Sequence, residues 1–297
     1  MNKKKLVCIV GTNASGKSGL GIELAKKFNA EIVSADSRQV FKGLDLGSGK
    51  VTVEEMQGVP HHMLDVAGIN EFYSLSDFQK GAYATIDDIF ARGYNPFLVG
   101  GTGLYLNALV DGYNLTECPP DEKLRKELEA KPIEELLKII REKDSAALER
   151  LDCNNKRRLE RAAEKLIMGV PLNLPSTPRY ETLLLGVTWD RPTLHKRIEE
   201  RLDRRLEQGM IEEVERLIAQ GATDEFLYKL GLEYRYILWY LRGKYESKQE
   251  FRAALKTAIN QLAKEQMTWF RKRKDIIWLD MTKNPLEQAS EKIRSFI

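Results

Sequence analysis

The sequence feature with the clearest chemistry is a short loop bounded by glycines near the N-terminus. It reads GTNASGKS and fits the pattern G-x-x-x-x-G-K-[S/T], which is typical of nucleotide-binding and ATP-binding loops. Backbone N–H groups and the start of the following helix attract phosphate in such a loop, the lysine reaches the terminal phosphates, and the last hydroxyl can bind Mg²⁺. We therefore predict that Ser18 binds a Mg²⁺ ion and that the whole loop binds phosphate: Gly11, Thr12, Asn13, Ala14, Ser15, Gly16, Lys17 and Ser18.

A carboxylate follows the next strand-like segment of the chain. Residues 31–35 look like a strand, and Asp36 follows them directly. Open α/β sheets bind ligands at the carboxyl ends of their strands, so Asp36 is placed to take a proton from a reacting group. The alternative is a structural aspartate that caps a helix or shapes a turn.

The elements that must position these residues alternate between strand and helix. Apolar runs predict strands at 6–10, 31–35 and 97–99, and periodic apolar residues predict helices that begin near residues 17 and 78. A glycine-rich turn at 100–103 leads into a further helix at Leu104. This alternation predicts an α/β fold with a parallel sheet.

The middle of the chain does not show this alternation of strand and helix. After Pro119-Pro120 the apolar spacing is helical, and a strand returns only near residue 183. Long helical stretches at 194–218 and 251–270 precede a last strand at 276–279. The prediction is a P-loop α/β catalytic core formed by 1–118 and 181–297, with a helical insertion domain at 119–180 and C-terminal helices.

Composition excludes several classes of protein. The 297 residues carry a net charge of +3, with 42% apolar and 31% charged residues, as in ordinary globular proteins. No apolar run is long enough to cross a membrane, and three scattered cysteines suggest neither zinc nor disulfides. Adjacent His61 and His62 would point to opposite sides of an extended segment and make a poor joint metal site. We expect a cytoplasmic protein without a membrane partner, most simply a monomer.

The phosphate loop alone does not decide the reaction. Similar loops serve NTPases, small-molecule kinases and enzymes that hold a diphosphate. An ATPase or GTPase would be expected to show a second apolar strand that ends in a metal-binding aspartate, whereas FLVGG ends in glycines and Asp280 lies very late in the chain. From these residues alone, a kinase with Asp36 as its base is the leading alternative.

Several segments together resemble the tRNA dimethylallyltransferases, also called tRNA isopentenyltransferases. These segments read GTNASGKS, SADSRQVF, PHHMLD, LVGGTGLYLNAL and AKEQMTWFRKR, in that order. The resemblance implies transfer of a dimethylallyl group from dimethylallyl diphosphate to N6 of an adenosine beside the tRNA anticodon, with release of diphosphate and with Mg²⁺ as cofactor. The partners would be dimethylallyl diphosphate and the anticodon stem-loop of tRNA.

The resemblance also implies roles for individual residues. Asp36 would accept the proton from N6, Lys17 would stabilise the departing diphosphate, and Thr102 would position the substrate. Arginines of the helical insert would contact phosphates of the anticodon stem, so that the insert clamps the RNA; a merely solvated helix face is the alternative. The implied tRNA-binding residues are Asp36, Ser37, Arg38, Gln39, Thr102, Arg125, Arg157, Arg158 and Arg161.

Three segments depart from the family pattern. The loop has Thr12-Asn13 where a Pro-Thr pair is usual, Glu265 stands where an arginine is typical, and residues 230–236 replace a Gly-Tyr-Lys-Glu segment. These departures leave two alternatives to the transferase: the small-molecule kinase, and an RNA-binding relative that has lost catalysis.

Overall fold

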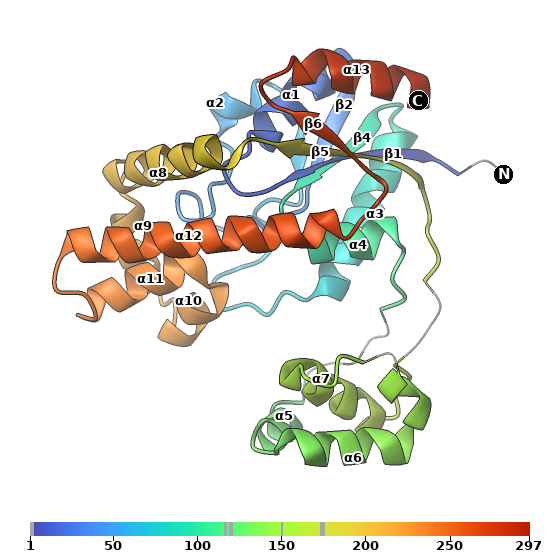
Figure 1. Cartoon of the computed structure of the whole chain (residues 1–297), viewed down its shortest axis with the longest axis vertical. Helices are drawn as coiled ribbons and strands as arrows, with labels where there is room; N and C mark the ends of the chain where they lie inside the picture. Colours follow the sequence, from blue (N-terminus) through green and yellow to red (C-terminus); the bar gives the residue numbers. More distant parts are fainter. Residues whose placement is uncertain (1–2, 116–117, 119–120, 150, 173–175) are drawn as a thin grey trace. The chain divides into compact units, whose positions relative to one another are not determined.

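The computed structural model describes residues 3–115, 118, 121–149, 151–172 and 176–297. The chain forms two compact units, one made of Met1–Val110 with Pro178–Ile297 and the other of Asp111–Thr177 (Figure 1). We call the first the core unit and the second the insert, and we describe each by itself. The predicted boundary at Pro119-Pro120 lies outside the described residues.

The core unit is built on one parallel six-stranded sheet with the strand order β3-β2-β4-β1-β5-β6. The structure confirms the predicted α/β fold and all five predicted strands. The additional strand, β3, is only two residues long, which is too short to give a periodic signal in the sequence. The strands are β1 (Lys5–Gly11), β2 (Ala30–Ser34), β3 (His61–His62), β4 (Asn95–Gly100), β5 (Glu181–Thr188) and β6 (Ile276–Asp280).

Helices cover both faces of the sheet (Figure 1). On one face lie α1 (Lys17–Lys27) and α13 (Pro285–Phe296), which share a buried apolar cluster with one side of the strands. On the other lie α3 (Leu75–Ala91), α4 (Gly103–Val110) and α12 (Lys248–Arg271). Parallel strands covered on both faces are apolar along nearly their whole length, as β1 is after its exposed first residue, Lys5.

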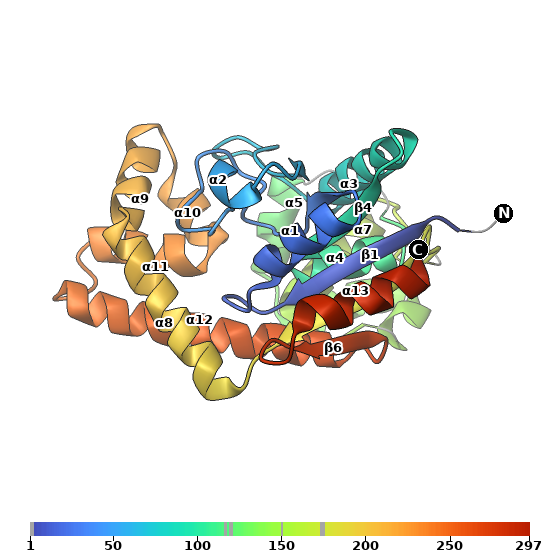
Figure 2. The same cartoon turned by 90° about the horizontal axis from the view of Figure 1, so that it is seen from above.

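The remaining helices of the core unit lie at one end of it (Figure 2). The predicted helix at 194–218 is two helices, because Gly209 adopts a left-handed conformation (φ 95°) between them. No helix among the described residues is both long and apolar enough to span a bilayer. The helices are α2 (Val53–Met56), α8 (Arg191–Glu207), α9 (Met210–Ala219), α10 (Asp224–Leu230) and α11 (Leu232–Leu241).

A close approach of two backbones fixes the edge of the sheet where β2 and β4 end. A Cβ atom at Gly100 would lie 2.2 Å from the carbonyl oxygen of Ala35, so only glycine fits there. The Thr102 N–H then donates to the same carbonyl over 3.2 Å. The residues that follow β4 are thereby held against the residues that follow β2, which include Asp36.

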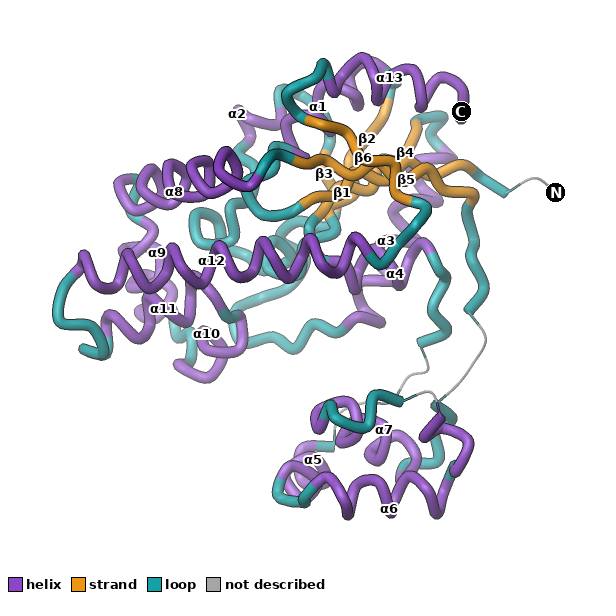
Figure 3. The backbone as a smooth tube through the Cα atoms, in the orientation of Figure 1, coloured by secondary structure: helices purple, strands orange, loops and turns teal. Residues whose placement is uncertain are grey.

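The described part of the insert consists of helices and loops (Figure 3), and it has its own apolar core. Leu136, Ile140 and Leu159 are fully buried at its centre. Its described part is helical or loop, with no strand. The elements are α5 (Glu122–Glu129), α6 (Ile133–Lys143), a 3₁₀ helix (Ser145–Glu149) and α7 (Lys156–Ile167).

Candidate active site

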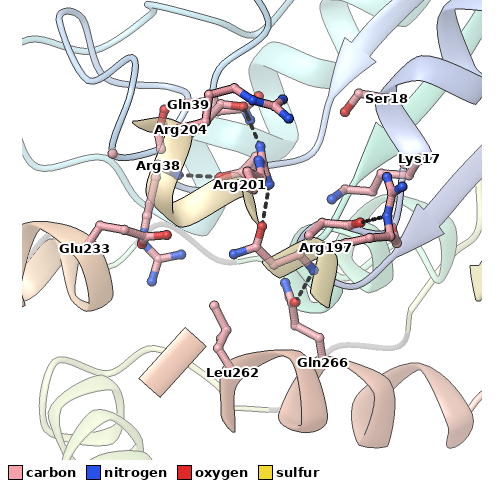
Figure 4. Close-up of a pocket in the computed structure, with 18 of the residues that line it drawn as sticks. Lys17, Ser18, Arg38, Gln39, Arg197, Arg201, Arg204, Glu233, Leu262 and Gln266 are labelled. Carbon is pink, nitrogen blue, oxygen red and sulfur yellow. Dashed lines mark hydrogen bonds between the residues drawn. The ribbon is translucent and has the colours of Figure 1, made fainter. Parts of the chain in front are cut away.

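A polar cavity of about 270 Å³ opens where β1 and β2 end (Figure 4). It brings the phosphate loop and the residues after β2 into one site, as the sequence predicts for ligand binding in an open α/β sheet. Ser37 and Thr102 are not among its lining residues. The lining residues are Asn13, Ala14, Ser15, Gly16, Lys17, Ser18, Asp36, Arg38, Gln39, Gly47, Ser48, Gly49, Arg197, Glu200, Arg201, Arg204, Glu233, Leu262 and Gln266.

The phosphate loop has the conformation that its glycines allow. Gly16 (φ 88°) precedes the first residue of α1, and no side chain caps that helix start. The first N–H groups of a helix have no partner within it, so this start is available to an anion. The Ser15 hydroxyl is buried without a hydrogen-bond partner among the described residues, and a phosphate oxygen would supply one.

Lys17 is the half-buried cation of this loop. Its Nζ donates to the Thr12 carbonyl over 3.3 Å. Burial lowers the pKa of Lys17 to about 8; the Asp36 charge opposes this shift, and nearby arginines add to it. The ammonium therefore lacks sufficient counter-charge, and a bound anion would provide it.

Arginines on one face of α8 form the opposite wall of the cavity. Arg197 and Arg201 are four residues apart, so they lie on the same side of the helix. The Arg197 Nε donates to the Ala14 carbonyl over 3.0 Å, and its guanidinium stacks 4.7 Å from the Trp189 ring. The Arg201 Nη1 donates to the Asn13 side-chain oxygen over 2.5 Å. Both arginines are thus fixed to the phosphate loop itself.

Arg205 lies one turn further along α8, outside the cavity lining. Its Nη1 lies 3.7 Å from Glu233, while its Nη2 is buried with no hydrogen-bond partner among the described residues. A Cβ atom at Gly49 would clash with the Nη2 atoms of both Arg201 and Arg205, so the two guanidinium groups converge there. Burial lowers the pKa of both side chains, yet guanidinium groups remain charged in proteins. The site therefore holds excess positive charge.

None of these three arginines is among the residues predicted from the sequence. A usable signal was present, because Arg197, Arg201 and Arg205 recur every four residues in a stretch that reads as helix. Charged residues at helical spacing are, however, usually a solvated face, and only the fold reveals that this face meets the phosphate loop.

Asp36 lies in the cavity wall with its neighbours held by hydrogen bonds. One of its carboxylate oxygens accepts from the Arg38 N–H over 3.0 Å. The Thr102 hydroxyl accepts from the Ser37 N–H over 3.1 Å, which ties the turn after β2 to the turn after β4. Gln39 accepts from the Ser34 hydroxyl over 3.2 Å. Asp36 therefore has a defined position, with a second carboxylate oxygen that accepts no hydrogen bond from a described residue.

Helix α12 contributes one bridging side chain, Gln266. Its oxygen accepts from the Asn13 N–H over 2.8 Å, and its amide donates to the Gly101 carbonyl over 3.0 Å. The preceding residue, Glu265, is exposed and accepts from Gln261 on the same helix. The change at Glu265 therefore leaves the cavity lining unaltered, although it changes the charge of the outer face of α12.

The four predicted RNA-binding arginines of the insert fall into two pairs. Arg125 and Arg161 both donate to Glu164, which is almost fully buried, and Arg125 does so over 2.9 Å. Burial disfavours the Glu164 charge, but the hydrogen bonds from Arg161 and Arg125 outweigh it, so the pKa of Glu164 is lowered. Arg157 and Arg158 are exposed and form no ion pair with a described residue.

The groups available for a divalent metal are few. No cluster of three or more histidine, cysteine or acidic side chains suited to a metal exists among the described residues. Ser18 lies in the cavity beside Lys17. Mg²⁺ needs little more, because it usually keeps several water ligands and binds through one or two protein groups plus substrate phosphates. The residues present therefore fit a Mg²⁺ ion that arrives with a diphosphate.

Known proteins are similar to this chain over nearly its whole length. A family model described as IPP transferase matches residues 39–273, and one described as isopentenyl transferase matches residues 4–73. A tRNA dimethylallyltransferase 2 of Shewanella sediminis is 41% identical over 297 residues (98% of both chains), and a tRNA dimethylallyltransferase of Exiguobacterium sp. is 42% identical over 299 residues (99% of this chain and 96% of that one).

Solved structures are also similar to this chain. A tRNA isopentenylpyrophosphate transferase of Bacillus halodurans matches with a TM-score of 0.71 and 36% identity, over 98% of this chain and 100% of that one. A eukaryotic dimethylallyltransferase, in a structure described as acting on tRNA, matches with a TM-score of 0.83 and 26% identity, over 98% and 79% of the two chains. The chain therefore belongs to the IPP transferase family.

Proposed function

We propose that this protein transfers a dimethylallyl group from dimethylallyl diphosphate to N6 of an adenosine next to the tRNA anticodon. The observation that carries the proposal is the single cavity that holds the phosphate loop, Lys17 and Asp36 together. A diphosphate at the loop places the carbon–oxygen bond that breaks within the same cavity as a carboxylate. The names of the relatives, tRNA dimethylallyltransferases, supply the chemistry of donor and acceptor.

The leaving group explains the excess positive charge. When the carbon–oxygen bond breaks, diphosphate carries away the bonding electrons, and fixed cations stabilise that charge without reorganising. Lys17, Arg197 and Arg201 are suited to this because they are anchored to the loop. Mg²⁺ held by Ser18 and by phosphate oxygens would supply further neutralisation of the diphosphate.

The acceptor side requires a base. As N6 bonds to the allylic carbon it becomes acidic, and its proton passes to the Asp36 carboxylate. An adenine reaches such a cavity only if it leaves its stack. Arg38 and Gln39 line the cavity next to Asp36, so we assign them, with Ser37 and Thr102, to the placement of the target nucleotide.

The insert is assigned a supporting role. Its exposed Arg157 and Arg158 are suited to RNA phosphates, and such contacts orient a nucleic acid without reading its bases. Arg125 and Arg161 are held by Glu164 within the insert, and we assign them to the same RNA surface.

The test uses purified protein, dimethylallyl diphosphate, Mg²⁺ and unmodified tRNA, with mass analysis of the digested nucleosides. We expect prenylated adenosine, and we expect Asp36→Asn to lower the transfer rate by about 10²- to 10⁴-fold while donor binding persists. A parallel reaction with ATP and no tRNA tests for a kinase. ATP turnover without prenylated adenosine would reject the proposal, as would tRNA binding without transfer.

A further inference from the structure

The turn between α10 and α11 gathers two arginines from distant parts of the chain. Arg38 follows β2, and its Nε donates to the Leu230 carbonyl over 2.9 Å. Arg235 lies in the first turns of α11, and its Nε donates to the Tyr228 carbonyl over 2.9 Å. Both guanidinium groups are therefore held through Nε by backbone carbonyls near the end of α10.

The two groups converge on Gly231. A Cβ atom built on Gly231 would lie 3.5 Å from the Nη2 of Arg38 and 3.5 Å from the Nη2 of Arg235. The two nitrogen atoms are therefore separated by at most twice that distance. Neither arginine forms an ion pair with a described residue. Two guanidinium groups within this distance are suited to share one anion, and their fork geometry matches phosphate.

The surrounding turn is specialised rather than a routine helix connection. Gly231 has φ 76° and ψ −172°, a conformation essentially limited to glycine, and Leu232 follows with a positive φ of 34°. Arg235 also stacks 4.3 Å from the ring of Tyr228, which is 48% exposed. This turn places Arg235 in one defined position.

Neighbouring cations on these helices behave differently. Lys229 pairs with Glu225 at 2.5 Å, and Arg242 pairs with Asp224 at 2.7 Å. Arg235 thus differs from both in forming no ion pair with a described residue. The segment is also one of those that depart from the family pattern, so the family resemblance gives no role for Arg235.

The location indicates which anion binds. Arg38 lines the active-site cavity, whereas Arg235 does not, so the pair lies at the edge of the cavity rather than within it. A nucleotide whose base enters the cavity leaves its backbone at such an edge. We propose that Arg38 and Arg235 together bind one backbone phosphate of the substrate RNA, and that Arg235 is thereby a positioning residue for the target adenosine. This proposal rests on the proposed transfer to tRNA.

The test replaces Arg235 with Gln and measures prenyl transfer to an anticodon stem-loop RNA. We expect KM for the RNA to rise about tenfold, as for loss of a hydrogen bond between charged groups, with kcat unchanged. The slope of log affinity against log salt concentration should become shallower by about 0.7 to 0.9, the value of one phosphate contact. Arg242→Gln, the same change on the paired arginine that caps the C-terminus of α11, should leave both quantities at wild-type values.

A second set of measurements identifies the RNA phosphate that is bound and tests whether the pair binds the donor diphosphate instead. A series of stem-loop RNAs, each with one phosphate replaced by a neutral methylphosphonate, is bound to wild type and to Arg235→Gln. At one position the replacement should weaken binding to wild type but not to the variant. The dissociation constant for dimethylallyl diphosphate should be unchanged in the variant, which also shows that it is folded, and Arg235→Lys should be intermediate. An unchanged KM for RNA, or a loss confined to donor binding, overturns the inference. Wild-type enzyme that prenylates no RNA would instead reject the proposed function.

Discussion

At the scale of single residues, the site is defined by positive charge that lacks partners. Lys17 has a lowered pKa, Arg205 has an unpartnered buried Nη2, and Ser15 has an unpartnered hydroxyl. Unsatisfied buried polar groups are rare in folded proteins and require a reason. Here one reason covers all three, because Lys17 and Ser15 belong to the loop that would hold a diphosphate and the Arg205 charge helps to lower the pKa of Lys17. The free site is thus organised in advance for an anion.

The pKa of Lys17 predicts how donor binding depends on pH. In the free protein Lys17 loses its proton as the pH rises through about 8, whereas a bound diphosphate favours the charged form. Above that pH, binding must take up a proton, so the dissociation constant should rise with pH, by at most about tenfold per pH unit. Titration calorimetry with dimethylallyl diphosphate between pH 7 and pH 9.5, in buffers of different ionisation enthalpy, measures both quantities.

Lys17→Arg is the matched control for this dependence. An arginine stays charged throughout the range, so the variant should show a flat pH profile even if its overall affinity differs. A wild-type affinity that stays constant to pH 9.5 would contradict the assignment of Lys17 to the diphosphate.

The sequence predicts some of these residues much better than others. Residues 11–18 are contiguous, so their order alone indicates a phosphate loop. Arg201 and Gln266 reach that loop from residues far along the chain, and no local pattern connects them to it. The departure at Asn13 illustrates the difference: the sequence marks it as unusual, whereas the structure shows its side chain holding Arg201.

At the scale of elements, two helices from the C-terminal half complete a site that begins at the N-terminus. Helix α8 supplies the arginine row, and α12 supplies Gln266, which bridges the phosphate loop and the turn after β4. The sequence predicts that helices occupy these regions, because their apolar spacing is regular. The break at Gly209 and the packing of α8 on the loop depend on tertiary contacts, which spacing does not encode.

The Gln266 bridge gives a prediction about α12. Gln266→Leu removes both hydrogen bonds and leaves the Asn13 N–H without its acceptor. The free energy of unfolding should therefore fall by about 2 kcal/mol. Part of this loss should appear as a higher dissociation constant for dimethylallyl diphosphate, because the loop loses its anchor. Hydrogen exchange should also become faster at residues 11–16.

Gln261→Leu provides the control on the same helix. Gln261 is exposed and bonds only to Glu265 among the described residues, away from the cavity lining. Donor affinity and exchange in the loop should therefore match wild type. Equal effects of the two substitutions would mean that Gln266 acts through general helix stability rather than through the loop.

At the scale of the whole molecule, the chain separates donor chemistry from part of its proposed RNA binding. All of the cavity lining comes from the core unit. The insert has a closed apolar core and a buried Glu164 that takes its hydrogen bonds from within the insert. The entering and leaving segments of the insert meet at its base, where the Thr177 N–H donates to the Gly112 carbonyl over 2.9 Å. Such a unit can be exchanged without cutting through a core.

This separation predicts the effect of removing the insert. Replacing residues 113–176 by a short Gly-Ser linker should be tolerated, because the two ends are already hydrogen-bonded neighbours. The shortened protein should bind dimethylallyl diphosphate with wild-type affinity, while KM for tRNA should rise by about tenfold or more because several phosphate contacts are lost. Calorimetry for the donor and transfer kinetics for the tRNA measure the two effects separately.

In the full-length protein, the double variant Arg157→Gln/Arg158→Gln should raise KM for tRNA by part of this amount and leave donor binding unchanged. Weakened donor binding in the shortened protein would show that the core unit depends on the insert, and unchanged tRNA kinetics would show that the insert makes no contact with RNA.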